Sequence, residues 1–332
     1  MKFKFAVIGG GAWGTAIANL LARLDNSSVI IWANEKEVVD EINSFNKNSL
    51  FLKGVDLKNN IHATNNLSEA IAPLIFYVTP AQNFRNIILM QKDYIDSKSE
   101  IIICSKGIEI SSGKLLSEII DNILPNINFY ILSGPSFAHE VATNKPAALV
   151  LSSKIIQKSI NLIKYISSKN FRLYPSDDLI GVQLGGAIKN VYAISSGIVA
   201  GLNLGENARA ALLTRAISEM VRISIALGGN KESIFGLSGV GDMLLTCSSR
   251  LSRNFSLGVA LGEGTKNQDM LSNRKTIAEG YYTTKAIYDL TKNLEIDTPI
   301  LQSVYDILYK NANPISEADI LLSRPIKKSE FY

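Results

Sequence analysis

Lys189 is the residue of this sequence that is best suited to proton transfer. It shares one helical face with Gly185, Ala193 and Gly197, because the four residues follow one another at intervals of four. Small residues at this spacing indicate close helix packing, so we expect the lysine among them to be partly desolvated. Desolvation lowers the pKa of an amine towards the range in which it can donate and accept a proton. The alternative is an ordinary lysine whose amine reaches solvent.

A carboxylate that suits such a lysine occurs in the segment Gly239-Val-Gly-Asp242, and Thr246 follows four residues later. Asp242 and Thr246 therefore share a helical face. The two glycines allow the start of this helix to approach other backbone closely. As the partner of Lys189, Asp242 would keep the ammonium group oriented; otherwise it is only a helix cap.

Ser252-Arg-Asn254 suits an anionic substrate and precedes the helical run 255–261. Arg253 can form two parallel hydrogen bonds with phosphate oxygens, and the Asn254 amide and the helix N–H groups add donors. The alternative is a serine cap followed by a surface arginine.

Two turns follow strands of the expected sheet and so lie at its carboxyl edge, where open parallel sheets bind ligands. In Ser105-Lys-Gly107, Lys106 can reach a substrate phosphate; a solvated lysine is the alternative. In the segment Ser133-Gly-Pro-Ser-Phe-Ala-His139, Ser136 is expected to cap a helix, with His139 inside it as a packing or surface residue.

Gly9-Gly-Gly-Ala-Trp-Gly14 matches the GxGxxG pattern and lies between an expected strand and an expected helix, as dinucleotide binding requires. Gly9 would allow the tight turn, Gly11 would let backbone approach the pyrophosphate, and Gly14 would let helix and strand pack closely. The helix N-terminus then receives the phosphates. The alternative is a purely structural glycine turn.

The type of dinucleotide is left open by the residue about twenty positions after the last glycine, where an acid would bind the ribose 2′-hydroxyl. That residue is Asn34, followed by Glu35 and Lys36. A neutral Asn34 does not repel a 2′-phosphate and Lys36 attracts one, so NADP(H) is tolerated or preferred. Glu35 keeps NAD(H) possible.

Short apolar runs recur along the first half of the chain and alternate with helical or polar stretches. They span residues 4–8, 28–32, 74–78, 100–104, 129–132 and 148–151. This alternation predicts a mostly parallel sheet with helices on both faces.

Strand signals fade after residue 175, and helical patterns take their place. We expect helices from 179 past 200 and over 208–227, 255–261, 283–290 and 300–308, with a surface loop at 264–273. The predicted fold class is thus α/β: a Rossmann-like N-terminal dinucleotide-binding domain over residues 1–178 and an all-helical substrate and catalytic domain over residues 179–332.

Composition excludes several other classes of protein. At ~150 residues per domain, 332 residues suggest two domains. A net charge of +4 without a polybasic block gives no support to a nucleic-acid partner, and no apolar run reaches the ~20 residues of a membrane span. Cys104 and Cys247 lie far apart, and His62 and His139 are the only histidines, so we expect no metal site and a reducing, cytoplasmic setting.

Taken in order, these motifs resemble the bacterial NAD(P)-dependent glycerol-3-phosphate dehydrogenase family over nearly the whole chain. The resemblance rests on Gly9 to Thr15, Ser105-Lys-Gly-Ile-Glu109, Gly134-Pro-Ser-Phe-Ala138, Leu184-Gly-Gly-Ala-Ile-Lys-Asn190, Gly239-Val-Gly-Asp242, Leu245-Thr-Cys247 and Ser252-Arg-Asn254. No single segment suffices, but the ordered set is highly specific.

The resemblance implies reversible hydride transfer between NAD(P)H and dihydroxyacetone phosphate, giving sn-glycerol 3-phosphate for glycerophospholipid synthesis, and a homodimer. The implied catalytic residues are Lys189, Asn190, Asp242 and Thr246. The implied substrate contacts are Lys106, Gly134, Ser136, Lys189, Asp242, Ser252, Arg253 and Asn254. With the glycine loop, the implied cofactor contacts are Trp13, Asn34, Lys106, Ala138, Arg253, Ile277 and Glu279. Asn34 departs from the family pattern, in which many relatives carry a basic or histidine side chain.

Two other functions fit part of the pattern. One is a different two-domain dehydrogenase, acting on a 3-hydroxy acid or a nucleotide sugar; oxidation of a nucleotide sugar to an acid would need a nucleophilic cysteine, for which Cys247 is a poor candidate. The other is a non-catalytic sensor of the cofactor redox state, which would not need Lys189, Asp242 and Arg253 together.

Overall fold

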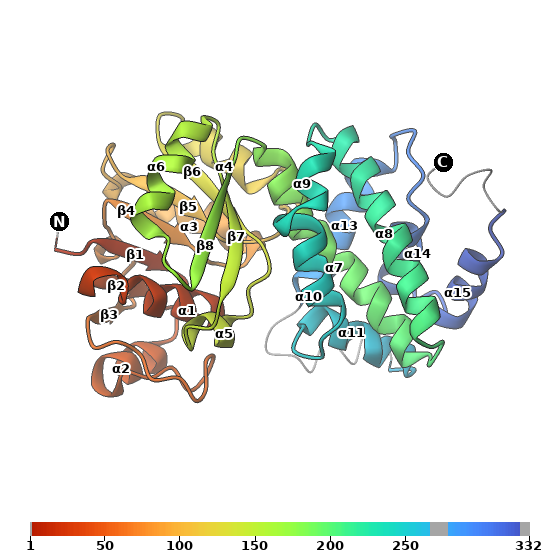
Figure 1. Cartoon of the computed structure of the whole chain (residues 1–332), viewed down its shortest axis with the longest axis horizontal. Coiled ribbons are helices and arrows are strands. Elements are labelled where there is room, and N and C mark those ends of the chain that lie inside the picture. Colours follow the sequence, from red (N-terminus) through yellow and green to blue (C-terminus); the bar gives the residue numbers. More distant parts are fainter. Residues whose placement is uncertain (1, 266–277, 326–332) are drawn as a thin grey trace. The chain divides into compact units, whose positions relative to one another are not determined.

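The structure is a computed structural model that describes residues 2–265 and 278–325 (Figure 1). The chain forms two compact units. The first comprises Met1–Lys106 and Leu115–Leu179, and the second comprises Gly107–Lys114 and Ile180–Tyr332. Residues 107–114 thus group with the second unit. The predicted boundary after residue 178 assigns them to the first domain.

An eight-stranded sheet forms the first unit, in the order β3-β2-β1-β4-β5-β6-β7-β8. The strands are β1 (Phe5–Ile8), β2 (Val29–Trp32), β3 (Ile61–Thr64), β4 (Leu74–Tyr77), β5 (Glu100–Ile103), β6 (Asn128–Ser133), β7 (Ala147–Ser152) and β8 (Phe171–Ser176). Every neighbouring pair is parallel except β6 and β7. The predicted, mostly parallel sheet is confirmed, although the sequence patterns did not indicate β3 and β8.

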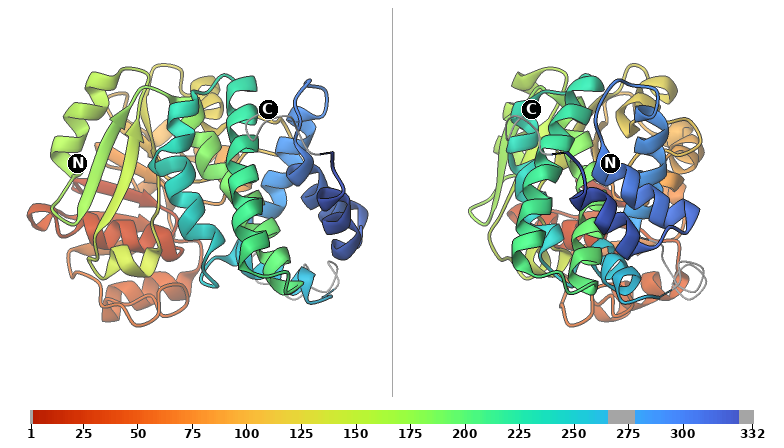
Figure 2. Two further views of the ribbon diagram at one scale, coloured as in Figure 1. Left: turned by 45° about the vertical axis from the view of Figure 1, so that its right-hand side comes forward. Right: turned by 90° about the vertical axis from the view of Figure 1, so that its right-hand side faces the viewer.

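Helices cover both faces of this sheet, as Figures 1 and 2 show. They are α1 (Ala12–Leu21), α2 (Lys36–Phe45), α3 (Phe84–Gln91), α4 (Leu116–Ile123), α5 (Ala138–Ala142) and α6 (Ile156–Ile166). On one face, side chains of α1, α2, α5 and α6 share a single apolar core with alternate strand residues. On the other face, Tyr77 contacts Phe84 and Gln91 of α3, which packs against α4.

The first six strands have the order 3-2-1-4-5-6. In this arrangement the chain direction across the sheet reverses between β1 and β4, and dinucleotides bind at the carboxyl ends of the strands beside that point. The fold of the first unit therefore places the glycine loop, which follows β1, at the expected binding edge.

Helices are the regular elements described in the second unit. They are α7 (Leu179–Gly201), α8 (Glu206–Ala226), α9 (Lys231–Phe235), a π-helix (Leu237–Gly241), α10 (Asp242–Cys247), α11 (Arg253–Gly262), α13 (Glu279–Thr291), α14 (Pro299–Lys310) and α15 (Pro314–Leu322). The predicted helical character is confirmed. Most of the loop expected at 264–273 lies outside the described residues.

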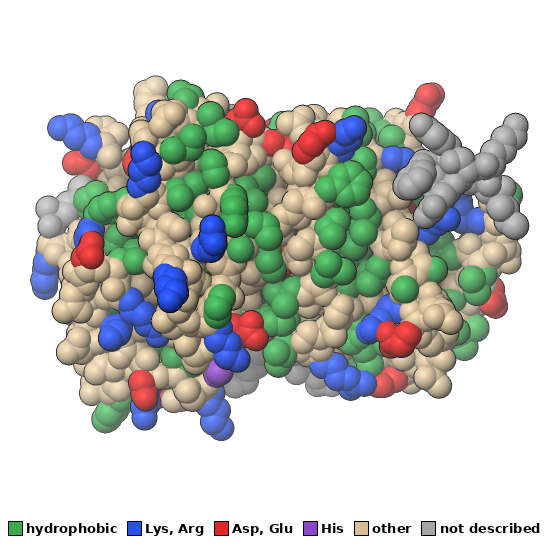
Figure 3. All heavy atoms as spheres, viewed as in Figure 1, with side chains coloured by type: hydrophobic (Ala, Val, Ile, Leu, Met, Phe, Trp, Pro, Cys, Tyr) green, Lys and Arg blue, Asp and Glu red, His purple; other side chains and the backbone are tan. Residues whose placement is uncertain are grey.

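The surface and the helix lengths bear on possible partners. On the face drawn in Figure 3, Lys and Arg side chains are scattered among acidic and neutral ones and form no continuous patch. Over the described parts of the chain, no helix combines the length and the apolar character needed to cross a membrane.

Candidate active site

The glycine loop between β1 and α1 has the geometry that its sequence predicts. Gly9 has φ +128°, and a Cβ there would lie 2.9 Å from the carbonyl oxygen of Val78. A Cβ on Gly14 would overlap the carbonyl oxygen of Gly9, so α1 can begin this close to its own turn only with glycine at that position. Two of the three glycines thus have the expected steric role.

Gly11 is different, because a Cβ there would meet no atom within 4 Å. It is the N-cap of α1, and no side chain caps this helix terminus. Open space beside uncapped first-turn N–H groups is what a bound phosphate requires. These features of the first unit fit the pyrophosphate of a dinucleotide.

Asn48 holds the glycine loop through hydrogen bonds. No sequence pattern indicated that this residue contacts the loop. Its amide donates hydrogen bonds to the Gly10 carbonyl oxygen (2.9 Å) and to Thr15 Oγ1 (2.8 Å), and the side chain is 1% exposed. It belongs to the connection between α2 and β3, which carries no recognisable motif. Only the fold brings it to the loop.

The other residues expected to contact the cofactor from the first unit surround this edge. Asn34 is exposed and lies two residues beyond the end of β2. Trp13 is in the first turn of α1, and Ala138 begins α5; both pack against the apolar core. Asn34 thus lies just beyond the carboxyl end of β2, at the same edge of the sheet as the glycine loop.

Lys106, Gly134 and Ser136 are brought together around one carbonyl group. Lys106 Nζ donates to the Gly134 carbonyl oxygen at 2.9 Å, and Ser136 Oγ donates to the same oxygen at 3.0 Å. The expectation that Ser136 caps a helix is wrong, because the N-cap of α5 is Phe137, one residue later. The Ser136 hydroxyl donates to the Gly134 carbonyl oxygen instead. His139 lies inside α5, as expected.

In the second unit, Lys189, Asp242 and Thr246 form one buried network. Lys189 Nζ lies 2.6 Å from Asp242 Oδ1 and donates to Thr246 Oγ1 at 2.7 Å. Thr246 Oγ1 in turn donates to the Asp242 carbonyl oxygen at 2.6 Å. Lys189 is 7% exposed and Asp242 is 1% exposed. Because both groups are shielded from water, each charge is compensated by the opposite charge of its partner.

Small residues on α7 are what allow this network to form. A Cβ on Gly185 would lie 2.8 Å from the Ser238 carbonyl oxygen in the π-helix, and one on Gly197 would overlap the Phe255 carbonyl oxygen in α11. Lys189 lies between these two close approaches, and α10 begins directly after the π-helix. The expected stripe of small residues is thus confirmed as a packing surface that carries a buried lysine.

Asn190 and Asn254 form a second buried network beside the first. Asn254 Nδ2 donates to Asn190 Oδ1 at 2.8 Å, and Asn254 Oδ1 accepts from the backbone N–H of Gly280 at 2.9 Å. Glu279, which precedes Gly280, is the first residue of α13. Ile277 lies outside the described residues.

Ser252 and Arg253 begin α11. Ser252 is the N-cap, and its side chain accepts from the Phe255 backbone N–H at 3.2 Å, so the cap expected as one alternative is present. Arg253 is the exposed first residue of the helix. Its position beside the helix N-terminus suits a phosphate group.

The two cysteines are poor nucleophiles. Cys104 and Cys247 are 1% and 0% exposed. Burial raises the pKa of the Cys247 thiol to about 12 and raises that of Cys104 above its ordinary value. Since the thiolate is the reactive form, the geometry does not favour oxidation of an alcohol to an acid through Cys247.

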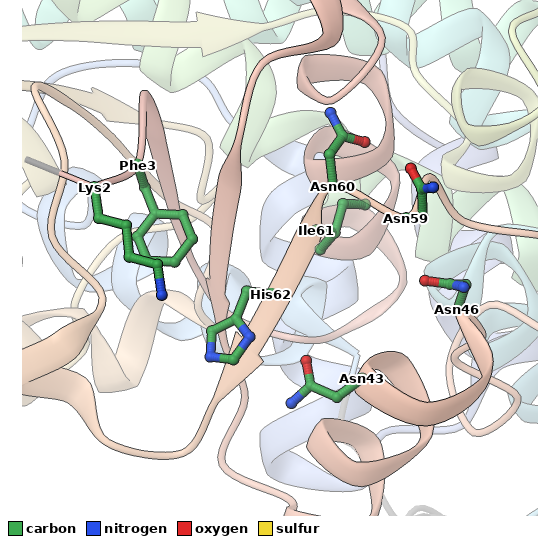
Figure 4. Close-up of a pocket in the computed structure, with 8 residues that line it drawn as sticks. All are labelled: Lys2, Phe3, Asn43, Asn46, Asn59, Asn60, Ile61 and His62. Carbon is green, nitrogen blue, oxygen red and sulfur yellow. The ribbon is translucent and has the colours of Figure 1, made fainter.

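A hollow of about 410 Å³ lies in the first unit, away from the glycine loop (Figure 4). Lys2 and Phe3 precede β1, whereas the glycine loop follows it, so the two features lie at opposite ends of that strand. The Phe3 and His62 rings stack at its edge with centroids 5.9 Å apart. The hollow contains none of the residues expected to bind cofactor or substrate; its lining consists of Lys2, Phe3, Asn43, Asn46, Asn59, Asn60, Ile61 and His62.

A sheet of this order with a glycine-rich first turn in one unit, and a buried lysine that could move a proton in the other, fit a nicotinamide-dependent dehydrogenase. Family models narrow this class. The model of the NAD-dependent glycerol-3-phosphate dehydrogenase N-terminus matches residues 4–159, and that of the C-terminus matches residues 178–319. The chain therefore belongs to the NAD(P)-dependent glycerol-3-phosphate dehydrogenase family of oxidoreductases.

Individual relatives support this assignment. A glycerol-3-phosphate dehydrogenase (NAD(P)+) of Erythrobacter litoralis is 44% identical over 328 residues, with 98% of both chains covered. The corresponding protein of Rhodospirillum rubrum is 42% identical over 324 residues, covering 97% of this chain and 93% of the relative. The crystal structure of the Coxiella burnetii glycerol-3-phosphate dehydrogenase has a TM-score of 0.91 at 37% identity, covering 97% of this chain and 99% of that one.

Proposed function

We propose that Lys189 is the proton donor and acceptor in the reversible conversion of dihydroxyacetone phosphate to sn-glycerol 3-phosphate. NAD(P)H, when bound, supplies the hydride. As the ketone is reduced, its oxygen gains negative charge, which a nearby ammonium group stabilises and then neutralises by giving up a proton. The observation that supports this role most strongly is the buried Lys189 Nζ, 2.6 Å from Asp242 Oδ1.

Asp242 and Thr246 would orient that amine. Asp242 keeps the ammonium form balanced in a buried environment, and Thr246 accepts one of its hydrogens at 2.7 Å. Asn190 follows Lys189 on α7 and is held by Asn254, so it would fix the helix segment that carries the lysine. In the reverse direction, the neutral amine would accept the proton of the alcohol.

The phosphate group of the substrate requires cationic and N–H donors. In the first unit we assign this role to Lys106, with Gly134 and Ser136 beside it. In the second unit we assign it to Arg253, with Ser252 and Asn254 at the same helix start. Fixing the phosphate orients the carbonyl group, which turns binding energy into rate.

Cofactor binding is assigned to the glycine loop and to a set of residues from both units. NADP(H) is tolerated or preferred and NAD(H) remains possible, because Asn34 is neutral and Lys36 lies nearby in sequence. The residues are Gly9, Gly11, Gly14, Trp13, Asn34, Lys106, Ala138, Arg253, Ile277 and Glu279.

The biological setting follows from the product. sn-Glycerol 3-phosphate is a precursor of glycerophospholipids, so we assign the protein to their synthesis, as a cytoplasmic homodimer without a nucleic-acid partner. Two buried, unpaired thiols suit a reducing compartment. Size-exclusion chromatography with light scattering tests the dimer, for which a monomer mass of 36.2 kDa is the reference.

A spectrophotometric assay tests the reaction. The absorbance of NADH and of NADPH is followed separately with dihydroxyacetone phosphate, and loss of absorbance with either cofactor is expected. Lys189→Met should lower kcat by ~10²-fold or more, measured on protein that circular dichroism shows to be folded, because the substitution also breaks the buried ion pair with Asp242. Lys231→Met, which removes an exposed lysine of α9, is the matched control and should leave kcat unchanged. Normal turnover by Lys189→Met would remove this residue from the role.

A further inference from the structure

Three hydroxyl side chains lie at the same level at the carboxyl ends of adjacent strands: two lie just beyond β4 and β5, and the third is the last residue of β6. Tyr77 of β4, Ile103 of β5 and Ile131 of β6 are register partners, and a hydroxyl residue lies two positions after each of them. These residues are Thr79, Ser105 and Ser133. All three therefore lie at the carboxyl edge of the sheet in the first unit.

Two of the three hydroxyls have no hydrogen-bond partner among the described residues. Thr79 is 4% exposed and Ser133 is 2% exposed, and neither Oγ atom is paired. Ser105 differs, because its Oγ donates to the Thr79 carbonyl oxygen at 2.5 Å. A buried hydroxyl without a partner is unfavourable, so two at the same level of one edge require an explanation.

The strand order indicates which ligand would supply the missing partners. The row that contains Thr79 continues to Gly10 of the glycine loop, since Ile8 and Tyr77 are register partners. In a sheet of order 3-2-1-4-5-6, the pyrophosphate lies at that loop, one nucleotide over β1 to β3 and the other over β4 to β6. The three hydroxyls all belong to the second half.

We propose that the Thr79 and Ser133 hydroxyls hydrogen-bond the nicotinamide nucleoside of the cofactor, and that Ser105 holds the Thr79 backbone for this purpose. The carboxamide and the ribose hydroxyls are neutral groups that both donate and accept, as a serine or threonine hydroxyl does. Rotation about χ1 changes the direction of either Oγ without moving the backbone. The inference rests on the proposed use of NAD(P)H.

The test measures binding of NADH and NADPH by their own fluorescence, with no substrate present. Thr79→Val and Ser133→Ala should each raise Kd by ~3- to 10-fold, the effect of losing one neutral hydrogen bond. ADP, which lacks the nicotinamide nucleoside, should bind these variants as it binds the wild type. The melting temperature without ligand should not fall, because an unpaired buried hydroxyl has been removed.

Ser152→Ala is the matched control. Ser152 is a fully buried serine whose hydroxyl also has no partner among the described residues, but it ends β7, which runs antiparallel to β6, and it pairs with Ile131, two residues before the carboxyl end of β6. Its loss should leave the Kd of NADH and NADPH unchanged. Thr79→Ser, which keeps the hydroxyl and removes the methyl group, should retain wild-type affinity.

Unchanged NADH and NADPH affinity in both edge variants would overturn the proposal. An equal loss of ADP affinity would also overturn it, as would a loss in Thr79→Ser as large as in Thr79→Val. Failure of the wild-type protein to bind either reduced cofactor would instead contradict the proposed function.

Discussion

The candidate sites of the two units consist of different kinds of chemical group. In the sheet unit the groups are mainly backbone: the turn at Gly9, the uncapped N-terminus of α1 and the Gly134 carbonyl that accepts from Lys106. In the helical unit they are buried side chains that pair with one another, above all Lys189 with Asp242.

This difference determines how each site can be damaged. A backbone site fails when an added side chain occupies the space reserved for a ligand, whereas a side-chain network fails when one charged or polar member is removed. Substitutions chosen on this basis should separate cofactor affinity from turnover and from stability.

The largest effect is expected from Asp242→Asn, which keeps the shape of the side chain but removes the negative charge beside Lys189. The variant should lose ~10²-fold or more in kcat, since the ammonium is no longer oriented by a carboxylate. The free energy of unfolding should fall by about 3–5 kcal/mol, because a buried ion pair has been broken. Steady-state kinetics and urea unfolding measure the two effects.

Asp289→Asn provides the comparison for an exposed ion pair. Asp289 lies 2.6 Å from Lys285 and 2.9 Å from Lys292 on α13, with about a third of its side chain exposed. Its loss should cost less than about 1 kcal/mol and leave kcat unchanged. Equal losses from the two variants would contradict the distinction between buried and exposed pairs.

The helical unit should also show a pH dependence of stability that comes from Glu219. This carboxylate of α8 is fully buried and accepts from the backbone N–H groups of Ile300 (3.0 Å) and Leu301 (2.8 Å) at the start of α14. Tyr192 of α7, a phenol whose pKa burial raises, donates to it at 3.2 Å. Burial raises the pKa of Glu219 from 4.5 to about 7.

A raised pKa means that the folded protein binds this proton more tightly than the unfolded chain does. The stabilisation is therefore complete below about pH 4.5 and is lost as the pH rises to about 7, a change of about 3 kcal/mol. In Glu219→Gln this contribution to the pH dependence should disappear. Chemical unfolding of both proteins at pH 5 and pH 8 measures it, and equal slopes in the two would contradict the assignment.

Much of the fold could be predicted from the sequence because its signals are local. The apolar runs and the GxGxxG pattern identify most of the parallel strands and the turn at Gly9, where glycine alone fits. β3 and β8 were not anticipated, since β3 is a four-residue edge strand and β8 contains Pro175. Short strands with polar or proline residues lack a clear pattern.

The candidate site was predictable only in part. The helical spacing around Lys189 indicated a packed lysine, and its expected pairing with Asp242 is confirmed, although the residue types alone left a helix cap as the alternative for that carboxylate, 53 positions away. Asn48 and Glu219 were missed because their partners, Gly10 and the start of α14, lie far away in sequence. Long-range polar contacts depend on the packing of whole elements, which no local pattern specifies.

A smaller effect, confined to cofactor affinity, is expected from Gly11→Ala. No atom lies within 4 Å of the position that the new methyl group would take, and the Gly11 φ of −69° suits alanine. The free energy of unfolding should therefore change by less than about 1 kcal/mol. The Kd of NADH and NADPH should rise by ~10-fold or more, because the methyl group occupies the space expected to receive the pyrophosphate.

Gly258→Ala should show the opposite pattern. A Cβ there would overlap the Ile194 carbonyl oxygen and force α11 away from α7. The expected result is a loss of about 1–3 kcal/mol in stability, with a smaller loss of cofactor affinity than in Gly11→Ala, since α11 carries only Arg253 of the assigned cofactor contacts. If both variants lost stability and affinity together, the two units could not be treated as separate in this respect.

The smallest effect is expected from Asn34→Asp, which tests cofactor choice alone. Asn34 is exposed and lies two residues beyond β2. An aspartate there would accept a hydrogen bond from a ribose 2′-hydroxyl and repel a 2′-phosphate, so the ratio of kcat/KM for NADH to that for NADPH should rise by ~3- to 10-fold. Asn59→Asp is the control, because it adds the same charge to the first unit at the hollow, which lies at the opposite end of the strands. It should leave the ratio of kcat/KM for NADH to that for NADPH unchanged. An equal change in both variants would mean that the general field of the protein, rather than position 34, sets the preference.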